Sequence, residues 1–322
     1  MSPPRLPRRA ALALPGLLLL RRPARAAWPE RPVRLIVPFP AGSGTDILAR
    51  LLAEPLGQRI GQPVVADNRP GGNGVVGAQA GAMAAADGYT LLILGTSAAA
   101  INPHTVRRLP YDPLRDFAPI GMLAEQPYVL AVGPNSPARD LAGFLALGHS
   151  RAEGLTFATG NAGSIIMAMM IGRMAGIRLT GVPYRGGAEA LADVAAGRVA
   201  FNLADFGPAL AQREAGRVRL LAQTLAHPFP LAPEIPPIAT ALPGFDANVW
   251  FSLVAPAATP PELLTPIGAA LDALLAEPAT AEKLARIGLA PLRLGRAETT
   301  RHFEQQLALW GERVRNAGTE PQ

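Results

Sequence analysis

Short apolar segments alternate with longer amphipathic segments along most of the chain. The short segments are typical of strands, and the longer ones have the apolar spacing of helices. The pattern predicts strands at Val33–Val37, Val64–Ala66, Thr90–Leu94, Tyr128–Val132, Leu155–Ala158, Val182–Tyr184, Ala200–Leu203, Leu220–Thr224 and Val249–Val254. It predicts helices at Asp46–Ile60, Gly74–Ala84, Leu141–Ser150, Ile165–Met174, Ala188–Ala195, Ala209–Glu214, Glu262–Leu275, Ala279–Ile287 and Ala297–Asn316. Because the two kinds of segment alternate, we expect an α/β fold with parallel sheets.

Pro55 lies inside the first predicted helix. A proline in a helix interior costs ~3 kcal/mol or more. We therefore expect a kink or an early end of the helix at this point.

A turn rich in glycine follows the first predicted strand. It runs through Phe39, Pro40, Ala41, Gly42, Ser43 and Gly44, and a helix opens after it at Thr45 or Asp46. Such a turn directs free backbone N–H groups at one point beside the positive end of the helix dipole, where a small anion binds. An ordinary strand-to-helix turn without a ligand is the alternative.

Three further loops of the same composition follow predicted strands. Asn68–Gly74 has three glycines, Gly95–Asn102 offers Thr96, Ser97 and Asn102, and the loop after Leu155–Ala158 consists of Thr159, Gly160, Asn161, Ala162, Gly163 and Ser164. Ligands of open parallel sheets bind at the carboxyl ends of the strands. The four loops together predict a cleft that holds an anion through neutral donors.

Two acidic residues follow predicted strands in equivalent positions. Asp46 comes after the first Gly-rich turn and Asp205 after Ala200–Leu203. Each could face a ligand, but an acid near a helix N-terminus is favourable through the helix dipole alone. The sequence leaves both interpretations open.

Residues 1–27 have the organisation of an export signal peptide. Arg5, Arg8 and Arg9 precede an apolar run, which ends before Ala24-Arg25-Ala26, and this order matches the charged region, apolar region and cleavage site of a secretory signal. Arg8-Arg9 is typical of the twin-arginine route, although the rest of that consensus is missing. We expect a periplasmic protein.

Removal of this segment changes the charge of the chain. The full sequence has 30 basic and 24 acidic residues and a net charge of +6, but six arginines and no acidic residue lie within residues 1–27. The remaining chain has no formal net charge, so the basic composition does not indicate a nucleic-acid partner.

The chemistry of the remaining chain is restricted. It has no cysteine, which excludes disulfides, thiolate metal sites and cysteine nucleophiles. No phosphate-binding loop, dinucleotide fingerprint or G-x-S-x-G nucleophile motif is present, and the four histidines are scattered without metal-ligand spacing. We expect no catalytic residues, no metal and no cofactor. The length after residue 27 is sufficient for two domains.

The ordered motifs resemble a known family. They include WPERPVRLIVPFPAGSGTD, GQPVVADNRPGGNGVVG, DGYTLLILGTS, LPYDPLRDFAPI, TGNAGS, VPYRGGAEAL, AGRVAF and WFSLVAPAATP, and the match extends from Trp28 to about Gly318. In these motifs the chain resembles the periplasmic solute-binding proteins of tripartite tricarboxylate transporters, the Bug or TctC-like family.

The resemblance implies a fold and a function. The fold is a two-lobed type II periplasmic binding protein clamshell, in which two Rossmann-like α/β domains are joined by two crossover strands near Gln126–Val132 and Trp250–Ala255. Domain 1 would comprise residues 28–125 and 253–322, and domain 2 residues 126–252. The family binds organic acids and implies a monomer. Closure of the hinge would trap the ligand and present it to the membrane components of the transporter.

The resemblance also implies a ligand site. The carboxylate would be held by backbone N–H groups of Phe39–Gly44 and Thr159–Ser164. Ligands of the family also contact the loop around Ser97 and Asn102, and sometimes the acids that correspond to Asp46 or Asp205.

Three positions depart from the family pattern. Ser43 interrupts the usual glycines of the first loop, and Met167 and Gly181 occupy positions where relatives often have histidine. The last two are polar groups lost near the cleft, and they predict a less polar ligand, such as an aromatic or branched monocarboxylate.

Two other functions remain as alternatives. A ligand sensor that docks on a membrane signalling receptor would use the same clamshell. An exported enzyme is the remote alternative, since the sequence has none of the nucleophile, metal or cofactor motifs considered above.

Overall fold

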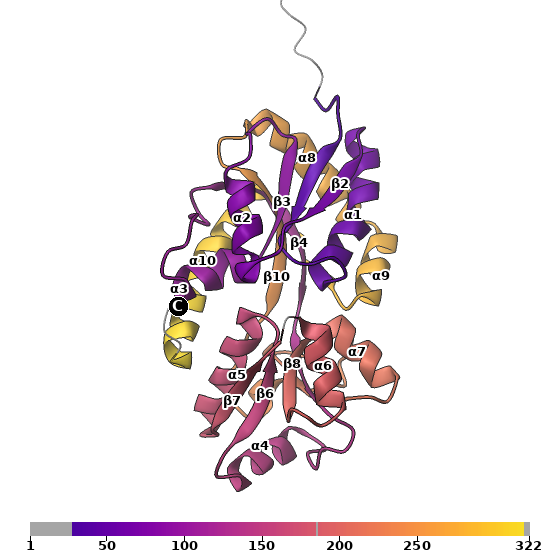
Figure 1. Ribbon diagram of the computed structural model, residues 1–322. Coiled ribbons are helices and arrows are strands. Elements are labelled where there is room, and N and C mark those ends of the chain that lie inside the picture. Colours follow the sequence, from indigo (N-terminus) through magenta and orange to yellow (C-terminus); the bar gives the residue numbers. More distant parts are fainter. Residues whose placement is uncertain (1–27, 185, 319–322) are drawn as a thin grey trace, which may run out of the picture.

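The computed structural model describes residues 28–184 and 186–318. The predicted export segment, residues 1–27, lies outside this range. Within it the chain forms two α/β lobes arranged end to end, and Figure 1 shows β4 and β10 extending from the upper lobe toward the lower one. The division into domain 1 and domain 2 at the residues given above stays a prediction.

The first lobe contains a six-stranded sheet in the order β11-β4-β10-β3-β1-β2. Its strands are β1 (Val33–Val37), β2 (Val64–Asn68), β3 (Thr90–Gly95), β4 (Phe117–Gln126), β10 (Val249–Pro256) and β11 (Ala290–Pro291). Its helices are α1 (Gly44–Ile60), α2 (Val75–Ala82), α3 (Asn102–Thr105), α8 (Pro261–Leu275), α9 (Pro278–Arg286) and α10 (Arg296–Ala317).

The second lobe contains a five-stranded sheet in the order β7-β6-β8-β5-β9. Its strands are β5 (Tyr128–Val132), β6 (Leu155–Thr159), β7 (Leu179–Pro183), β8 (Phe201–Asp205) and β9 (Arg219–Gln223). Its helices are α4 (Leu141–Ser150), α5 (Ala162–Ala175), α6 (Gly187–Ala195) and α7 (Phe206–Glu214).

Each sheet contains both parallel and antiparallel strand pairs. β1 pairs in parallel with β2 and β3, and β6 does so with β7 and β8. The expectation of parallel sheets therefore holds for these strands and is wrong for the others: β10 is antiparallel to β3 and β4, β11 to β4, and β5 to β8 and β9. β5 and β10 are the strands at which the chain crosses from one lobe to the other. Each enters its sheet from the other lobe and runs opposite to both of its neighbours.

The predicted fold class is confirmed, and each predicted strand overlaps an observed one. The pattern missed β4 and the short β11. Pro119 and Gly121 lie within β4, and both residue types are depleted in strand interiors. The long pairing of β4 with β10 supplies the stability that local propensity lacks.

The first helix shows how local sequence and packing combine. Ser43 caps its N-terminus, and Gly61 ends it in a left-handed conformation at φ 86°. Leu48, Leu52 and Leu56 are buried on one face. The predicted early end at Pro55 is wrong, because the helix continues to Ile60 with its buried face packed on the sheet. The alternative, a kink at Pro55, stays a prediction.

Candidate functional site

A cavity of about 260 Å³ lies between the two lobes. It lies where β4, β5 and β10 adjoin the N-terminal ends of helices from both lobes. Its lining consists of Phe39, Pro40, Ala41, Gly42, Ser43, Gly44, Thr45, Gly95, Thr96, Ser97, Gln126, Tyr128, Gly160, Asn161, Gly186, Gly187, Ala188, Asp205, Val249 and Phe251. This size is suited to a small molecule.

The first lobe contributes the start of α1. The Oγ of Ser43 accepts a hydrogen bond from the N–H of Asp46 at 3.3 Å, and the carbonyl of Ser43 accepts from Ile47. The backbone N–H groups of Gly44 and Thr45 have no acceptor within the described residues, and both residues line the cavity. They provide two donors at the positive end of the helix dipole.

Asp46 lies outside the cavity lining and stabilises this loop through hydrogen bonds. Its carboxylate accepts from the N–H of Gly42 at 2.9 Å, from Arg50 at 3.0 Å and from Asn68 at 2.9 Å. Burial alone would raise its pKa, but these bonds together keep the pKa of Asp46 below its ordinary value. Asn68 also donates to the carbonyl of Phe39. The network fixes the backbone of the turn.

The second lobe contributes the starts of α5 and α6. Asn161 caps α5 by accepting from the N–H of Ser164 at 2.9 Å. The N–H groups of Ala162 and Gly163 on α5, and of Gly187 and Ala188 on α6, have no acceptor among the described residues. Three helix N-termini therefore meet at this cavity, one from the first lobe and two from the second.

The strands that connect the lobes form the floor of the cavity. Tyr128 is 3% exposed and donates from its hydroxyl to Oδ1 of Asn161 at 2.8 Å. Burial, followed by the nearby charge of Asp205, raises the pKa of Tyr128 well above its ordinary value, so this phenol is neutral. Thr96, which follows β3, donates from its hydroxyl to the carbonyl of Trp250 and accepts from the N–H of Trp250. These bonds join the end of β3 to β10 beside the cavity.

Asp205 is the one ionisable acid or base other than a tyrosine in the lining that the structure describes. Its Oδ1 accepts a hydrogen bond from Nε2 of Gln126 at 3.0 Å. Loss of water around the carboxyl group raises the pKa of Asp205 to about 6, and the bond from Gln126 offsets only part of this rise. The cavity has no described Lys, Arg or His side chain opposite it.

The structure brings most of the predicted residues together. The cavity is lined by Phe39, Pro40, Ala41, Gly42, Ser43, Gly44, Thr96, Ser97, Gly160, Asn161 and Asp205. Asp46, Asn102, Thr159 and Ser164 lie outside the lining, because their polar groups bond within the protein. Asn102, for example, is 1% exposed and donates to the carbonyl of Asn73.

Met167 and Gly181, which occupy positions where relatives often have histidine, do not face the cavity. Met167 is fully buried in the core, and Gly181 lies in β7, next to the side chains of Thr159 and Phe157. Neither contributes to the lining. The argument for a less polar ligand from Met167 and Gly181 therefore has no structural basis.

Sequence reasoning missed the start of α6 and the floor. Gly186 and Gly187 before a predicted helix carried the same signal as the other Gly-rich turns. Gln126, Tyr128, Val249 and Phe251 gave no such signal, because their position depends on pairing between distant strands.

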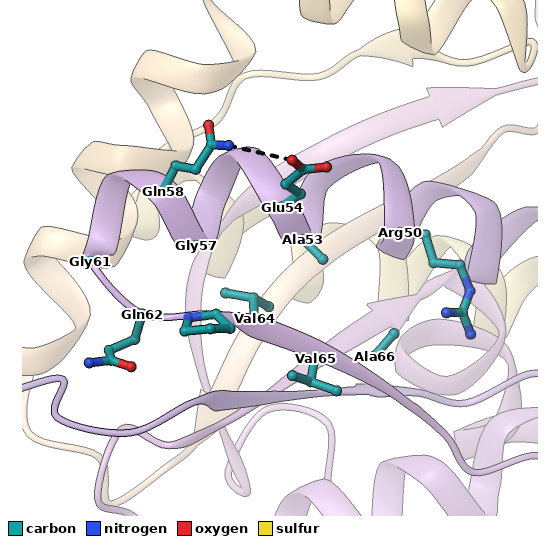
Figure 2. Close-up of a pocket in the computed structure, with 11 residues that line it drawn as sticks. Arg50, Ala53, Glu54, Gly57, Gln58, Gly61, Gln62, Val64, Val65 and Ala66 are labelled. Atoms are coloured by element: carbon teal, nitrogen blue, oxygen red, sulfur yellow. Dashed lines mark hydrogen bonds between the residues drawn. The ribbon is translucent and has the colours of Figure 1, made fainter.

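A larger hollow of about 730 Å³ lies elsewhere, between α1 and the edge strand β2. Figure 2 shows Ala53, Gly57 and Gln58 of α1 on one side and Val65 and Ala66 of β2 on the other. None of the predicted site residues lines it. It lacks the convergent donors of the cavity between the lobes.

Within the described ranges, no helix is both long and apolar enough to cross a membrane. Over the same residues no group of three or more His, Asp or Glu side chains is arranged to hold a metal ion.

Comparisons with known proteins place these features in a family. A family model described as the tripartite tricarboxylate transporter family receptor, TctC, matches residues 48–319. A UPF0065 protein of Bordetella bronchiseptica is 34% identical over 317 residues, which cover 97% of this chain and 94% of that protein.

Two solved structures are similar over almost their whole length. The structure of R. palustris Rpa4515 with adipate has a TM-score of 0.87 and 34% identity, covering 92% of this chain and all of that one. MatC from Rhodopseudomonas palustris with bound malate has a TM-score of 0.81 and 27% identity, covering 89% of this chain and all of that one.

Proposed function

Because the chain belongs to the TctC family, whose members are periplasmic substrate-binding proteins and not enzymes, we propose that it captures a small organic acid between its two lobes. The observation that carries this proposal is the convergence of three helix N-termini with free N–H groups on one cavity. Helix N-termini are suited to carboxylates. Adipate and malate are the acids in two similar structures.

In this proposal the ligand carboxylate is held by neutral donors from both lobes. Gly44 and Thr45 of α1 donate from the first lobe, and Gly187 and Ala188 of α6 donate from the second. A ligand that bonds both sides stabilises the arrangement in which the lobes meet. Thr96, Ser97 and Asn161 surround the rest of the molecule.

The further steps of the proposal concern location and partners. Residues 1–27 direct export to the periplasm, and the loaded protein delivers the acid to the membrane components of a tripartite tricarboxylate-type transporter. Deletion of the gene should abolish uptake of the acid. Loss of a transcriptional response to the acid with unchanged uptake would instead identify a sensor that presents the ligand to a membrane receptor.

The first test is thermal melting of the purified protein with a panel of carboxylic acids that includes adipate and malate. A ligand that binds only the folded state adds about 2.7 kcal/mol at a hundredfold excess over its Kd. We expect one chemical class of acids to raise the melting temperature by a few degrees. No shift with any acid, in protein shown by mass spectrometry to carry no bound ligand, contradicts the proposal.

The second test removes one donor without removing the helix. Gly44 is the first residue of α1, and Ser43 before it is extended at φ −70°, ψ 160°, so proline fits at position 44. Gly44→Pro deletes the N–H and should weaken binding about tenfold or more, since a bond to a charged group contributes about 1.5–3 kcal/mol. Gly44→Ala is the matched control, because a Cβ at this position meets no atom within 4 Å.

A further inference from the structure

Asp205 is an unusual residue for an anion-binding site, because its own side chain is an anion when ionised. Among the described residues that line the cavity, it is the one that carries a formal charge near neutral pH. Its charge has the same sign as that of a carboxylate ligand, and the other donors around the cavity are neutral. Two carboxylates in one desolvated site repel each other strongly unless one of them is protonated.

The position of Asp205 in the fold turns its side chain toward the cavity. Asp205 is the last residue of β8 and the N-cap of α7, yet its side chain does not cap that helix. An aspartate at an N-cap ordinarily accepts from the first turn of the helix. Here Oδ1 accepts from Gln126 of β4 instead, and Gln126 is the one hydrogen-bond donor to the carboxylate of Asp205 among the described residues.

The groups that surround Asp205 leave its charge without a described cationic partner in the cavity. Tyr128, its register partner on β5, is a neutral phenol, and Gln126 on β4 is an amide. A Cβ added to Gly187 of α6 would lie 3.9 Å from Oδ2 of Asp205. Arg286 at the end of α9 lines an adjoining cavity of about 210 Å³ that Asp205 also borders. Arg185, before Gly186, lies outside the described residues.

We propose that Asp205 is a specificity-determining residue, which contacts the bound acid directly and holds a proton when the ligand presents a carboxylate. The protonated carboxyl group then donates a hydrogen bond to the ligand instead of repelling it. This inference rests on the proposed function. It means that capture of the acid near neutral pH takes up one proton from solvent, and that release returns it.

The pH dependence of binding follows from the state of Asp205 before the ligand arrives. Burial raises its pKa to about 6, so the form that binds is abundant below that pH and becomes rarer above it. If only the protonated form binds, the affinity falls by about tenfold for each pH unit above 6. Ligands that place a hydroxyl or ammonium group against Asp205 bind its ionised form, so their affinity does not fall above pH 6.

The test compares the protein with Asp205→Asn, which has the same shape but no titrating group. Calorimetric titrations use adipate, or the first acid of the panel that binds the unmodified protein, at pH 5.5, 6.5, 7.5 and 8.5. We expect the affinity of the unmodified protein to fall about tenfold per unit above pH 6.5, and that of Asp205→Asn to stay constant between pH 6.5 and 8.5. Titration in two buffers of different ionisation enthalpy should show uptake of about one proton at pH 7.5 in the unmodified protein and none in the variant.

The controls separate the possible failures. Asp272→Asn removes an exposed acid that pairs with Arg293 on the surface, and it should retain the unmodified pH profile. Identical profiles of the unmodified protein and Asp205→Asn would overturn the inference and leave the proposed function intact. Loss of binding in folded Asp205→Asn at every pH would also overturn it, because Asp205 would then act as an ionised acceptor. Absence of binding by any acid to either protein overturns the proposed function together with the inference.

Discussion

Asp46 and Asp205 lie near the start of a helix in different lobes and have opposite environments. Asp46 is in the first turn of α1, and Asp205 is the last residue of β8 and the N-cap of α7. Asp46 is enclosed by Arg50, Asn68 and the N–H of Gly42, which keep its pKa low despite burial. Asp205 has a single amide partner, and burial raises its pKa to about 6.

The difference lies in the neighbours and not in the local sequence. Arg50 is four residues after Asp46 on the same helix, so its position relative to Asp46 follows from helical geometry. Asp205 meets Gln126 only because β5 pairs with β8 and continues from β4. The first acid stabilises the scaffold of the site, whereas the second is available to a ligand.

Replacement of Asp46 should have the largest effect on stability. Asp46→Ala removes three hydrogen bonds to one carboxylate, and we expect a loss of about 3 kcal/mol in the free energy of unfolding at pH 7, measured by urea denaturation. Because the pKa of Asp46 is lowered on folding, its contribution is present above the unfolded pKa and is lost as the pH falls below about 4. Asp46→Asn keeps the shape and should lose less. An Asp46→Ala protein as stable as the original would refute the structural role.

Asp205→Asn should change stability in the opposite direction. A pKa raised from 3.8 to about 6 means that the folded state holds the proton more tightly, so stability falls as the pH rises between these values. The full cost above pH 6 is about 3 kcal/mol, and contact with the open cleft reduces it to about 1–2 kcal/mol. We expect the ligand-free variant to be more stable by this amount at pH 7.5 and equally stable near pH 3.5. A lower stability of the variant at pH 7.5 would contradict the assigned environment.

Gly207, next to Phe206 on α7, tests whether the environment of Asp205 depends on contact between the lobes. A Cβ on Gly207 would lie 2.2 Å from the carbonyl oxygen of Ile287 in the first lobe. Gly207→Ala should hold the lobes apart, weaken binding of the acid about tenfold and leave the first lobe intact. Small-angle scattering of the ligand-saturated protein should show a larger radius of gyration. Gly268→Ala in α8 is the control, since its Cβ lies 3.6 Å from the nearest atom.

Tyr128→Phe should have the smallest effect. It removes the hydroxyl that donates to Asn161, the cap of α5. Loss of one neutral hydrogen bond within the protein corresponds to about 1 kcal/mol of folding stability, so we expect the melting temperature to fall by a few degrees and the affinity to change little. A change in the pH profile of binding would show that Tyr128, and not Asp205 alone, controls the titration.

The sequence predicted the parts of the site that depend on local chemistry. The Gly-rich turn before α1 and the loop before α5 line the cavity, because glycine composition and helix capping are short-range signals. The bounds of β1 and β5 agree with the predicted ones residue for residue, since their apolar runs are short and clearly delimited.

The remaining features depend on contacts between distant residues. β4 contains Pro119, and β10 is antiparallel to both of its neighbours, so neither feature follows from a pattern along the chain. The same is true of Gln126 beside Asp205. Sequence alone could therefore identify both acids but could not assign them different roles.

One residue, Pro127, separates β4 of the first sheet from β5 of the second. The residues on either side of it, Gln126 and Tyr128, both line the cavity, so the cavity lies at the junction between the lobes. A rotation of one lobe relative to the other about this point would move the cavity lining by a small distance and the far ends of the lobes by a larger one. Helices α4 and α8 lie toward opposite ends of the molecule (Figure 1), so a rotation between the lobes would displace them most. A rotation of a few degrees between the lobes would therefore produce its largest displacement on the outer surface of the protein.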